Sequence, residues 1–185
     1  MKDNEVLRII KSRRSIRSYR TEQISQDELD AILEAGIFAA TGVNMQPWYF
    51  TIIQKKEVID DISEKARDVM KKSPDARVVD MANRSDHLFY HAPTVIIVSG
   101  KSDDYLALTD CSAAIQNMLV AAESLNIGST WVGSISYFLT LEAEVKKLNI
   151  PAGYKPFYAV CFGYKNPAVQ VSVPPRNRNV FDYIR

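Results

Sequence analysis

Residues 13–19 read Arg-Arg-Ser-Ile-Arg-Ser-Tyr, and the rest of the chain is best interpreted around this stretch. The side chains of an extended chain alternate between two faces, which would place Arg13, Ser15 and Arg17 on the same side. Guanidinium groups bind phosphate through paired charge-assisted hydrogen bonds, and a serine hydroxyl adds another donor. The stretch therefore predicts an anion site, although a solvated basic turn would have the same composition.

The composition is typical of a globular protein, with 46% hydrophobic and 24% charged residues. A chain of 185 residues suits one domain, so we expect a single domain spanning residues 1–185. Lys and Arg number 23 against 22 Asp and Glu, and this balance argues against a nucleic-acid partner. No apolar run resembles a secretory signal or is long enough to span a bilayer, so we expect a cytoplasmic protein without a membrane partner.

The patterns of cysteine, histidine and glycine residues argue against several classes of functional site. Cys111 and Cys161 lack a Cys-x-x-Cys spacing and are interpreted as small buried hydrophobic residues. His87 and His91 would share a helix face, but no His-Glu-x-x-His pattern or third ligand accompanies them, so we expect no metal site. Neither glycine-rich nucleotide signature is present. A phosphate bound here would therefore be held by arginine side chains.

Hydrophobic periodicity predicts alternating helices and strands along the chain. Helices are expected at residues 3–12, 26–39, 56–72, 75–87, 104–126 and 140–148, and strands at residues 48–54, 94–99, 129–135 and 155–164. Ser25 and Glu28 form a capping box, Gly128 is the expected end of the 104–126 helix, and Thr140 is the expected cap of the last helix. The β-branched run at 94–99 predicts a strand buried on both faces.

Three further segments carry residues suited to ligand contact. Residues 40–48 are expected to form a loop with small polar side chains before a strand, although such loops often have no role in binding. Gly133 lies within the expected extended segment, where it indicates either a close approach of a ligand to the backbone or a bulge. Arg176 and Arg178 repeat the Arg-x-Arg spacing near the end of the chain.

Four motifs in this order resemble the FMN-dependent nitroreductase family, and the resemblance covers nearly the whole chain. They are Arg13-Arg14-Ser15-Ile16-Arg17-Ser18-Tyr19, Thr41-Gly42-Val43-Asn44-Met45-Gln46-Pro47-Trp48, Asn126-Ile127-Gly128-Ser129-Thr130-Trp131-Val132-Gly133 and Arg176-Asn177-Arg178. The first two motifs are the most specific. Thr41 departs from the family pattern, which more often has a serine after a proline, but it keeps the hydroxyl.

The resemblance implies an α+β fold, a nitroreductase-like α/β/α sandwich with a mostly antiparallel central sheet, in a domain-entwined homodimer with FMN at its interface. It also implies cofactor-binding roles for ten residues. Arg13, Arg14, Ser15 and Arg17 would hold the ribityl phosphate and the pyrimidine edge, Thr41 and Asn44 would reach the flavin across the dimer, Val132 and Gly133 would face its ring, and Arg176 and Arg178 would close on the phosphate. Asn83 and Arg84, within the 75–91 segment, receive no role.

The implied activity is an FMN-dependent oxidoreductase that takes hydride from NADH or NADPH and reduces nitroaromatic, quinone or related acceptors by a ping-pong mechanism. We expect no catalytic side chain, because the flavin supplies the redox chemistry and solvent could supply the second proton. The alternatives are a specialised flavin chemistry, such as reductive dehalogenation or flavin fragmentation, and a non-catalytic flavin-binding sensor or carrier.

Overall fold

The centre of the protein is a four-stranded antiparallel sheet, seen in a computed structural model that describes residues 3–185. Its strands are β1 (Trp48–Ile53), β2 (Thr94–Lys101), β3 (Ile127–Val132) and β4 (Tyr154–Tyr164), in the spatial order β1-β2-β4-β3. The register pairs Ile96 of β2 with Ile52 on one side and with Val160 on the other. Every residue of β2 except Lys101 is buried, which confirms the strand predicted from the β-branched run.

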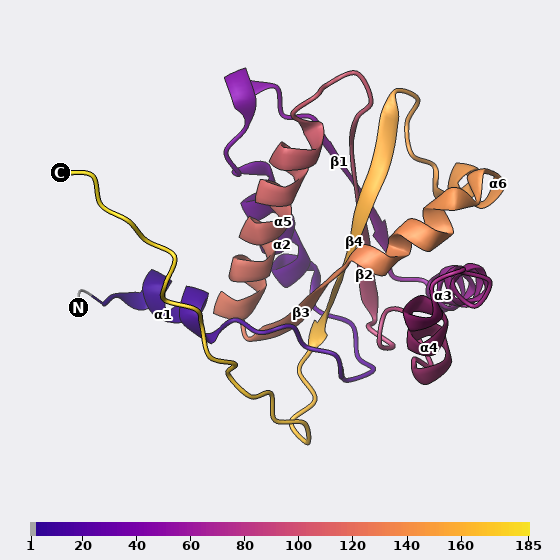
Figure 1. Ribbon diagram of the computed structural model, residues 1–185, viewed down its shortest axis with the longest axis horizontal. Helices are drawn as coiled ribbons and strands as arrows, with labels where there is room; N and C mark the ends of the chain where they lie inside the picture. Colours follow the sequence, from indigo (N-terminus) through magenta and orange to yellow (C-terminus); the bar gives the residue numbers. More distant parts are fainter. Residues whose placement is uncertain (1–2) are drawn as a thin grey trace.

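Helices α2 (Gln26–Ile37) and α5 (Ala107–Ser124) cover one face of the sheet (Figure 1). The predicted capping box at Ser25 and Glu28 is present at the start of α2. Ile32 of α2 and Met118 of α5 are fully buried in the hydrophobic core on this side. The apolar stripes of the two helices are therefore what cover this face of the sheet.

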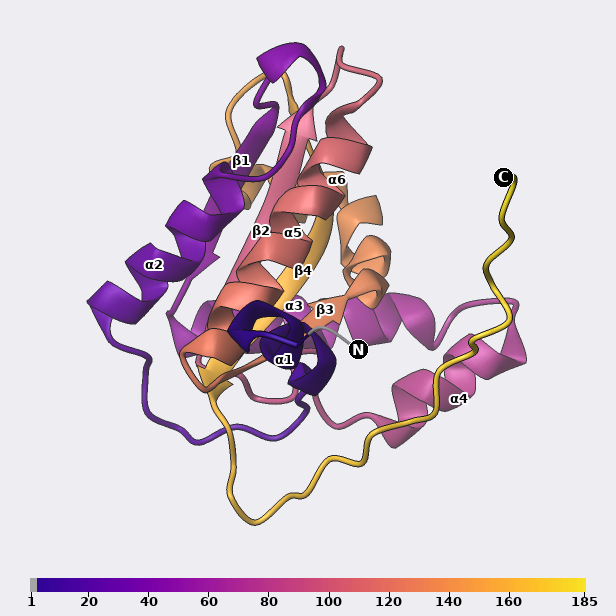
Figure 2. The same cartoon turned by 90° about the vertical axis from the view of Figure 1, so that its left-hand side faces the viewer.

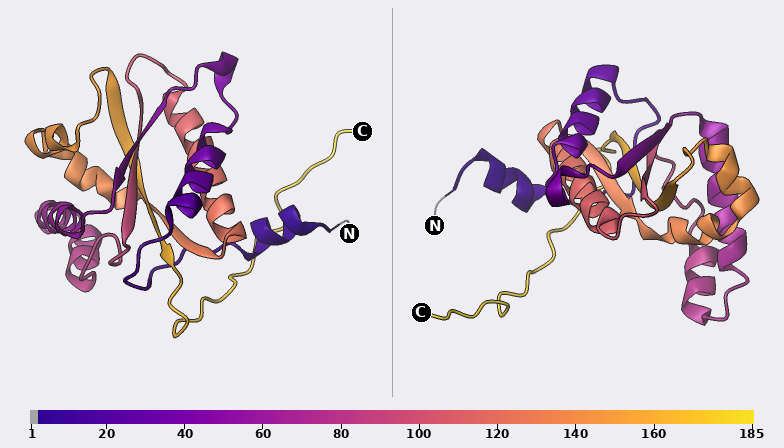
Figure 3. Two further views of the ribbon diagram at one scale, coloured as in Figure 1. Left: turned by 180° about the vertical axis from the view of Figure 1, so that it is seen from behind. Right: turned by 90° about the horizontal axis from the view of Figure 1, so that it is seen from above.

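Helices α3 (Lys56–Met70) and α4 (Ala76–Arg84) lie on the opposite face, as the view from behind shows (Figure 3). The 3₁₀ segment η2 (Gly133–Thr140), helix α6 (Glu142–Val145) and the 3₁₀ turn η3 (Lys146–Leu148) complete this layer. Ile62, Phe89 and Phe138 are buried in a second core there. The chain thus forms three layers with a core on each face of the sheet, and the predicted α+β, α/β/α architecture is confirmed.

The two ends of the described chain extend away from the three layers (Figure 1), and Figure 2 shows the C-terminal tail, in yellow, reaching beyond them. Helix α1 (Glu5–Ser12) has no buried residue, and residues 167–185 form an exposed tail without helix or strand. No helix in the described part of the chain is both long and apolar enough to cross a membrane. The cytoplasmic location stays a prediction.

Both cysteines are buried and free, as expected. Burial, followed by the nearby charge of Asp110, raises the pKa of the Cys111 thiol to about 12. The pKa of the Cys161 thiol is likewise raised by burial. Because the thiolate is the reactive form, neither side chain is suited to nucleophilic chemistry.

Several predicted boundaries around β3 were wrong. Helix α5 ends at Ser124, and Asn126 rather than Gly128 adopts the left-handed conformation, with φ 59°, because asparagine tolerates that region. Gly128 lies inside β3, where an added Cβ would be 2.9 Å from Ile16 Cγ2. Close packing of the chain across β3 therefore explains that glycine.

The segment after β3 also differs from prediction. The strand ends at Val132, so Gly133 begins a 3₁₀ segment instead of lying within an extended one. Thr140 caps no helix, because its hydroxyl donates to the carbonyl oxygen of Tyr137 at 2.8 Å and α6 starts only at Glu142. In the same layer, α4 ends at Arg84 rather than at residue 87.

Candidate functional site

The basic stretch at residues 13–19 is extended and lies across the end of the sheet. Ser15 forms a parallel bridge with Ser129 of β3, and the N–H of Ile16 donates to the carbonyl oxygen of Ser129 at 2.9 Å. Tyr19 forms an antiparallel bridge with Lys165, just beyond β4. Ile16 is buried against Gly128, so the stretch is anchored by its backbone and by one apolar side chain. The polar side chains are left available for a ligand.

Three arginines gather at this anchored stretch. Burial lowers the pKa of Arg13, and the positive charges of Arg14 and Arg176 lower it further, against an opposing effect of Glu123. Arg176 belongs to the tail, so the structure brings two of the predicted basic motifs together. Arg178 is exposed and exerts no such effect on Arg13.

The donors of Arg14 are only partly used. Its Nη1 donates to the carbonyl oxygens of Lys11 and Arg13, each at 2.6 Å, whereas its buried Nε has no hydrogen-bond partner in the described part of the chain. A cavity of about 210 Å³ opens beside it, with Arg17 and Lys165 also in its lining. Lys165 is paired with Glu123 at 2.9 Å. A buried donor without a partner is costly, so this cluster is suited to an anion.

Arg17, which lines this cavity, also contacts another part of the molecule. Its guanidinium carbon lies 5.7 Å from the ring centroid of Tyr90, within the range of a cation–π contact. Tyr90 and the following His91 both have positive φ, 55° and 54°. Arg17 thus connects the basic stretch to the turn that leads into β2.

The end of β3 supplies the other two residues predicted on this side. Val132 is buried and Gly133 is exposed. An added Cβ at Gly133 would meet no atom of residues 3–185 within 4 Å, and positive φ among the described glycines occurs only at Gly153. Neither packing within the chain nor backbone conformation therefore requires a glycine at position 133, which leaves room for a ligand against the backbone.

The loop that carries Thr41 and Asn44 is held by a residue that the sequence did not single out. The Oδ2 of Asp110 accepts from the Thr41 hydroxyl at 2.7 Å and from the Gly42 N–H at 3.0 Å. The Thr41 hydroxyl in turn accepts from the N–H of Gln46 at 3.0 Å. Asp110 is only 5% exposed, on a helix whose inner face is otherwise apolar. The sequence could have indicated this role, because Asp110 is a charged residue at a core-facing position of the helix predicted for residues 104–126.

This loop is strained as well as anchored. Val43, Asn44 and Gln46 all have positive φ, at 43°, 60° and 44°. Such conformations cost free energy for residues other than glycine and persist only where surrounding contacts impose them. The bonds from Thr41 and Gly42 to the buried carboxylate are the contacts that impose this shape.

Within one chain, the predicted residues form two separate sets. The Thr41 loop is bonded to Asp110 near the start of α5, whereas Ser12, next to the basic stretch, donates to Glu123 near its end at 3.0 Å. Thirteen helical residues separate these two anchors, which is about 20 Å along a helix. Figure 1 shows the loop before β1 and helix α1 at opposite ends of α5. One chain alone does not bring the two sets together.

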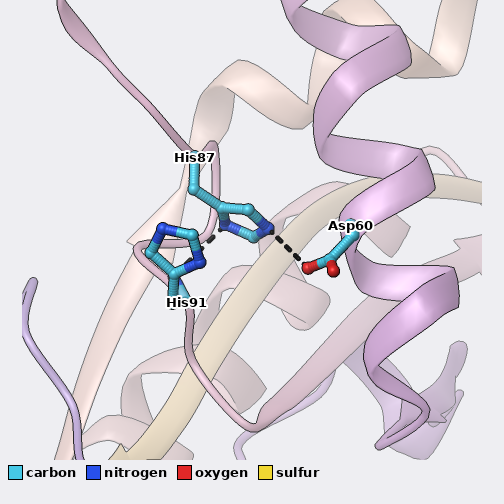
Figure 4. Close-up of side chains that lie close together, drawn as sticks. All are labelled: Asp60, His87 and His91. Carbon is cyan, nitrogen blue, oxygen red and sulfur yellow. Dashed lines mark hydrogen bonds and ion pairs between the residues drawn. The ribbon is translucent and has the colours of Figure 1, made fainter.

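His87 and His91 lie in a turn, and their rings stack with centroids 4.3 Å apart (Figure 4). Asp60 of α3 joins them, so that three potential metal-ligand atoms lie within 4.8 Å of one another. However, the Nδ1 of His87 accepts from the N–H groups of Phe89 at 3.1 Å and His91 at 3.2 Å. The Nε2 of His87 therefore carries the proton and donates to Asp60 at 3.2 Å.

This bonding favours a structural role for His87. A neutral imidazole has one lone pair, and here the backbone uses it, so His87 has none to offer a metal ion. The expectation of no metal site remains a prediction. The ring holds the turn that presents Tyr90 to Arg17.

Acid is expected to destabilise the protein through His87. Burial lowers its pKa below the ordinary value of 6.5, with His91 adding to the effect and Asp60 opposing it. The unfolded state then binds more protons between the two pKa values, so stability is complete above pH 6.5 and falls as the pH drops toward the folded pKa. Urea unfolding at pH 7.5 and 5.5 measures this loss.

The variant His87→Gln should reduce the loss between these two pH values, since it cannot be protonated. His91→Gln is a partial control, because it removes only the smaller contribution of His91 to the pKa of His87 and keeps the buried ring, so most of the loss should remain. An equal pH dependence in wild type and His87→Gln would contradict the role assigned to this ring.

Comparison with known proteins identifies close similarity over most of the chain. The family model described as "Nitroreductase family" matches residues 10–164. A protein of Archaeoglobus fulgidus, provisionally named as an NADH dehydrogenase/NAD(P)H nitroreductase, is 33% identical over 163 residues, covering 86% of this chain and 85% of its own. The FMN reductase [NAD(P)H] of Bacillus subtilis is 28% identical over 182 residues, covering 94% of this chain and 70% of its own.

A solved structure extends the similarity to three dimensions. The crystal structure of a nitroreductase from Bacteroides fragilis with bound FMN has a TM-score of 0.91 at 32% identity. The match covers 99% of this chain and all of that one.

Proposed function

The chain belongs to the nitroreductase family, and from this we infer that it is an NAD(P)H-dependent FMN oxidoreductase acting as one domain. We propose nitroaromatic compounds, quinones or related molecules as its electron acceptors. FMN, when bound, would supply the redox chemistry, which is hydride acceptance from a nicotinamide and electron transfer to the acceptor. The protein's own contribution is to bind, orient and stabilise charge.

The arginine cluster is the observation that supports FMN most strongly. Arg13 and Arg14 lie on the anchored stretch, and Arg176 comes close enough to lower the pKa of Arg13. Like charges held together in a partly buried place repel each other until an anion neutralises them. The unpartnered Nε of Arg14 and the open space at Gly133 fit the phosphate and the flat ring of FMN.

Each predicted residue then has a specific task. Arg13, Arg14, Ser15 and Arg176 bind the phosphate, and Arg178 closes on it from the tail. Arg17 binds the pyrimidine edge, where negative charge gathers on reduction, and a fixed cation favours that charge. Val132 and Gly133 present their backbone to the ring. No side chain is proposed to act as a nucleophile or as an obligatory acid or base.

Two chains are needed to assemble this site, and we propose a homodimer in which Thr41 and Asn44 belong to the partner. The separation of about 20 Å along α5 supports this arrangement, since a single chain keeps the loop away from the arginines. Large apolar side chains are also exposed at the loop and in the tail: Phe38 is 76% exposed, Val43 90% and Phe181 76%. Exposed apolar surface of this kind is typical of protein interfaces.

Donor and acceptor are proposed to use the same open side of the ring in turn, which gives ping-pong kinetics. Such kinetics would appear as parallel lines in double-reciprocal plots at several NADH concentrations. Intersecting lines would contradict this order of binding.

The absorption spectrum of the purified protein tests the proposed function. We expect a yellow protein that NADH or NADPH bleaches without oxygen and that a nitro compound or a quinone then reoxidises. A yellow protein that neither nucleotide bleaches would favour a flavin carrier or sensor. A colourless protein that binds no added FMN would contradict the proposal.

A further inference from the structure

A second cavity, separate from the arginine cluster, adjoins the proposed flavin site. Its volume is about 690 Å³, and it lies between α4, the end of α3 and the start of η2. Tyr90 in its lining is the ring over which Arg17 lies, and Ser134 in its lining follows Gly133. Cavities of 300–1,000 Å³ are the usual size for small-molecule sites. The cavity is therefore placed beside the residues proposed to hold the ring.

Three arginines and two aspartates, Asp80 and Asp86, line this cavity, which leaves an excess of one positive charge. Arg67 is only partly exposed; its Nη1 donates to the carbonyl oxygen of Asp86 at 2.9 Å, and its Nε donates to the carbonyl oxygen of Ala82 at 3.4 Å. It forms no ion pair with a carboxylate in the described part of the chain, so its charge is not neutralised there. A cation left in this state at a cavity wall favours an anionic ligand.

Two more guanidinium groups line the same cavity, and each forms only an exposed ion pair. Arg84 pairs with Asp80, and Arg77 pairs with Asp75 at 2.8 Å. Both arginine side chains are mostly exposed, 79% and 91%, and exposed ion pairs contribute little free energy. A ligand carboxylate could therefore displace these partners at low cost.

Apolar and aromatic side chains form another part of the lining, beside the polar Ser85 and Ser134. Met70, Met81 and Leu88 face the cavity together with Tyr90. Methionine side chains fill irregular spaces and contact aromatic rings favourably. A flat aromatic ring would be held by these side chains while an anionic substituent reached the arginines.

We propose that this cavity binds the electron acceptor and selects aromatic acceptors that carry a carboxylate, which Arg67 and Arg84 bind. The proposal rests on the proposed function, because it names the substrate class of that enzyme. A phosphate of the nicotinamide donor has similar anionic chemistry, and the experiment distinguishes the two sources.

The test compares para-nitrobenzoate with para-nitrobenzamide, which have nearly the same shape and differ in charge. In the FMN-loaded full-length enzyme with NADH, Arg84→Gln should raise KM for the acid about tenfold, the effect of losing one charged hydrogen bond, and leave KM for the amide within about twofold. Arg84→Lys should retain much of the preference. Lys71→Gln, also at the end of α3 but outside the cavity lining, removes the same charge and should change neither KM.

Two results would overturn the proposal. One is an equal change, or no change, in KM for the acid and the amide. The other is a change in KM for NADH alone, while a neutral donor such as reduced N-benzylnicotinamide is unaffected, which would assign the anion site to the donor.

A binding measurement separates this proposal from the proposed function. Calorimetric titration of the oxidised protein with para-nitrobenzoate needs no turnover, so it is informative even if no acceptor is reduced. We expect binding of the acid to weaken about tenfold in Arg84→Gln relative to Lys71→Gln. Binding that is equal in the two variants, or absent in wild type, would contradict the cavity's role.

Discussion

Replacing Arg13 with glutamine is expected to weaken FMN binding by roughly 10- to 100-fold, the free energy of one or two hydrogen bonds to a charged group. Arg13 is held beside Arg14 and Arg176, whose charges lower its pKa. The free protein should lose no stability, because the substitution relieves this repulsion. Fluorescence titration of the apoprotein with FMN measures the affinity, and thermal unfolding measures the stability.

The control for this variant is Arg20→Gln. Arg20 follows the same stretch and pairs with Glu22 at 2.7 Å, outside the cluster. Its replacement should leave FMN affinity within about twofold, since exposed pairs contribute little. If both variants bind FMN equally well, Arg13 has no part in the cofactor site. If Arg13→Gln mainly destabilises the apoprotein, its role is structural.

Replacing Asp110 with asparagine is expected to lower the melting temperature by about 3–10 °C, because two hydrogen bonds to a buried charge are weakened or lost. The Thr41 loop would then relax from its strained conformation. FMN affinity should fall roughly tenfold, since the loop is proposed to complete the partner's flavin site. Differential scanning calorimetry and FMN titration report the two effects.

Thr41 provides a double-mutant test of the same bond. Thr41→Val removes the hydroxyl that donates to Asp110, so the double variant should cost little more than either single one. Thr109→Val is the control, because Thr109 is the exposed neighbour of Asp110 on α5. Additive losses would show that the two residues act independently, and would contradict the proposal that Asp110 holds the loop through Thr41.

Local features of this fold could be predicted because short-range physics determines them. The capping box at Ser25 and Glu28 needs only neighbouring residues, and the burial of β2 follows from its own β-branched run. The arginine stretch was recognisable for the same reason. The end of α5 and the start of β3 were harder to predict from the sequence. Asn126 and Gly128 both suit a helix end, and tertiary packing decides between them.

The parts of the site that were missed all depend on contacts between distant segments. Asp110 accepts a hydrogen bond from Thr41, which lies 69 residues earlier in the chain. Arg67 becomes a cavity residue only because α4 folds back against α3. The Nδ1 of His87 accepts a hydrogen bond within a turn. This turn was not predicted, because His87 had been assigned to a helix at residues 75–87 and α4 ends at Arg84. Periodicity within one segment carries no information about such pairs.

Native mass spectrometry of the purified full-length protein tests the central claim most directly, because it reports chain number and bound cofactor in one measurement. The separation of the Thr41 loop from the arginine cluster predicts a dimer carrying two FMN molecules. Arg13→Gln should yield the same dimer with less FMN. A monomer that retains FMN would contradict a site shared between two chains, and a dimer that takes up no added FMN would contradict the cofactor.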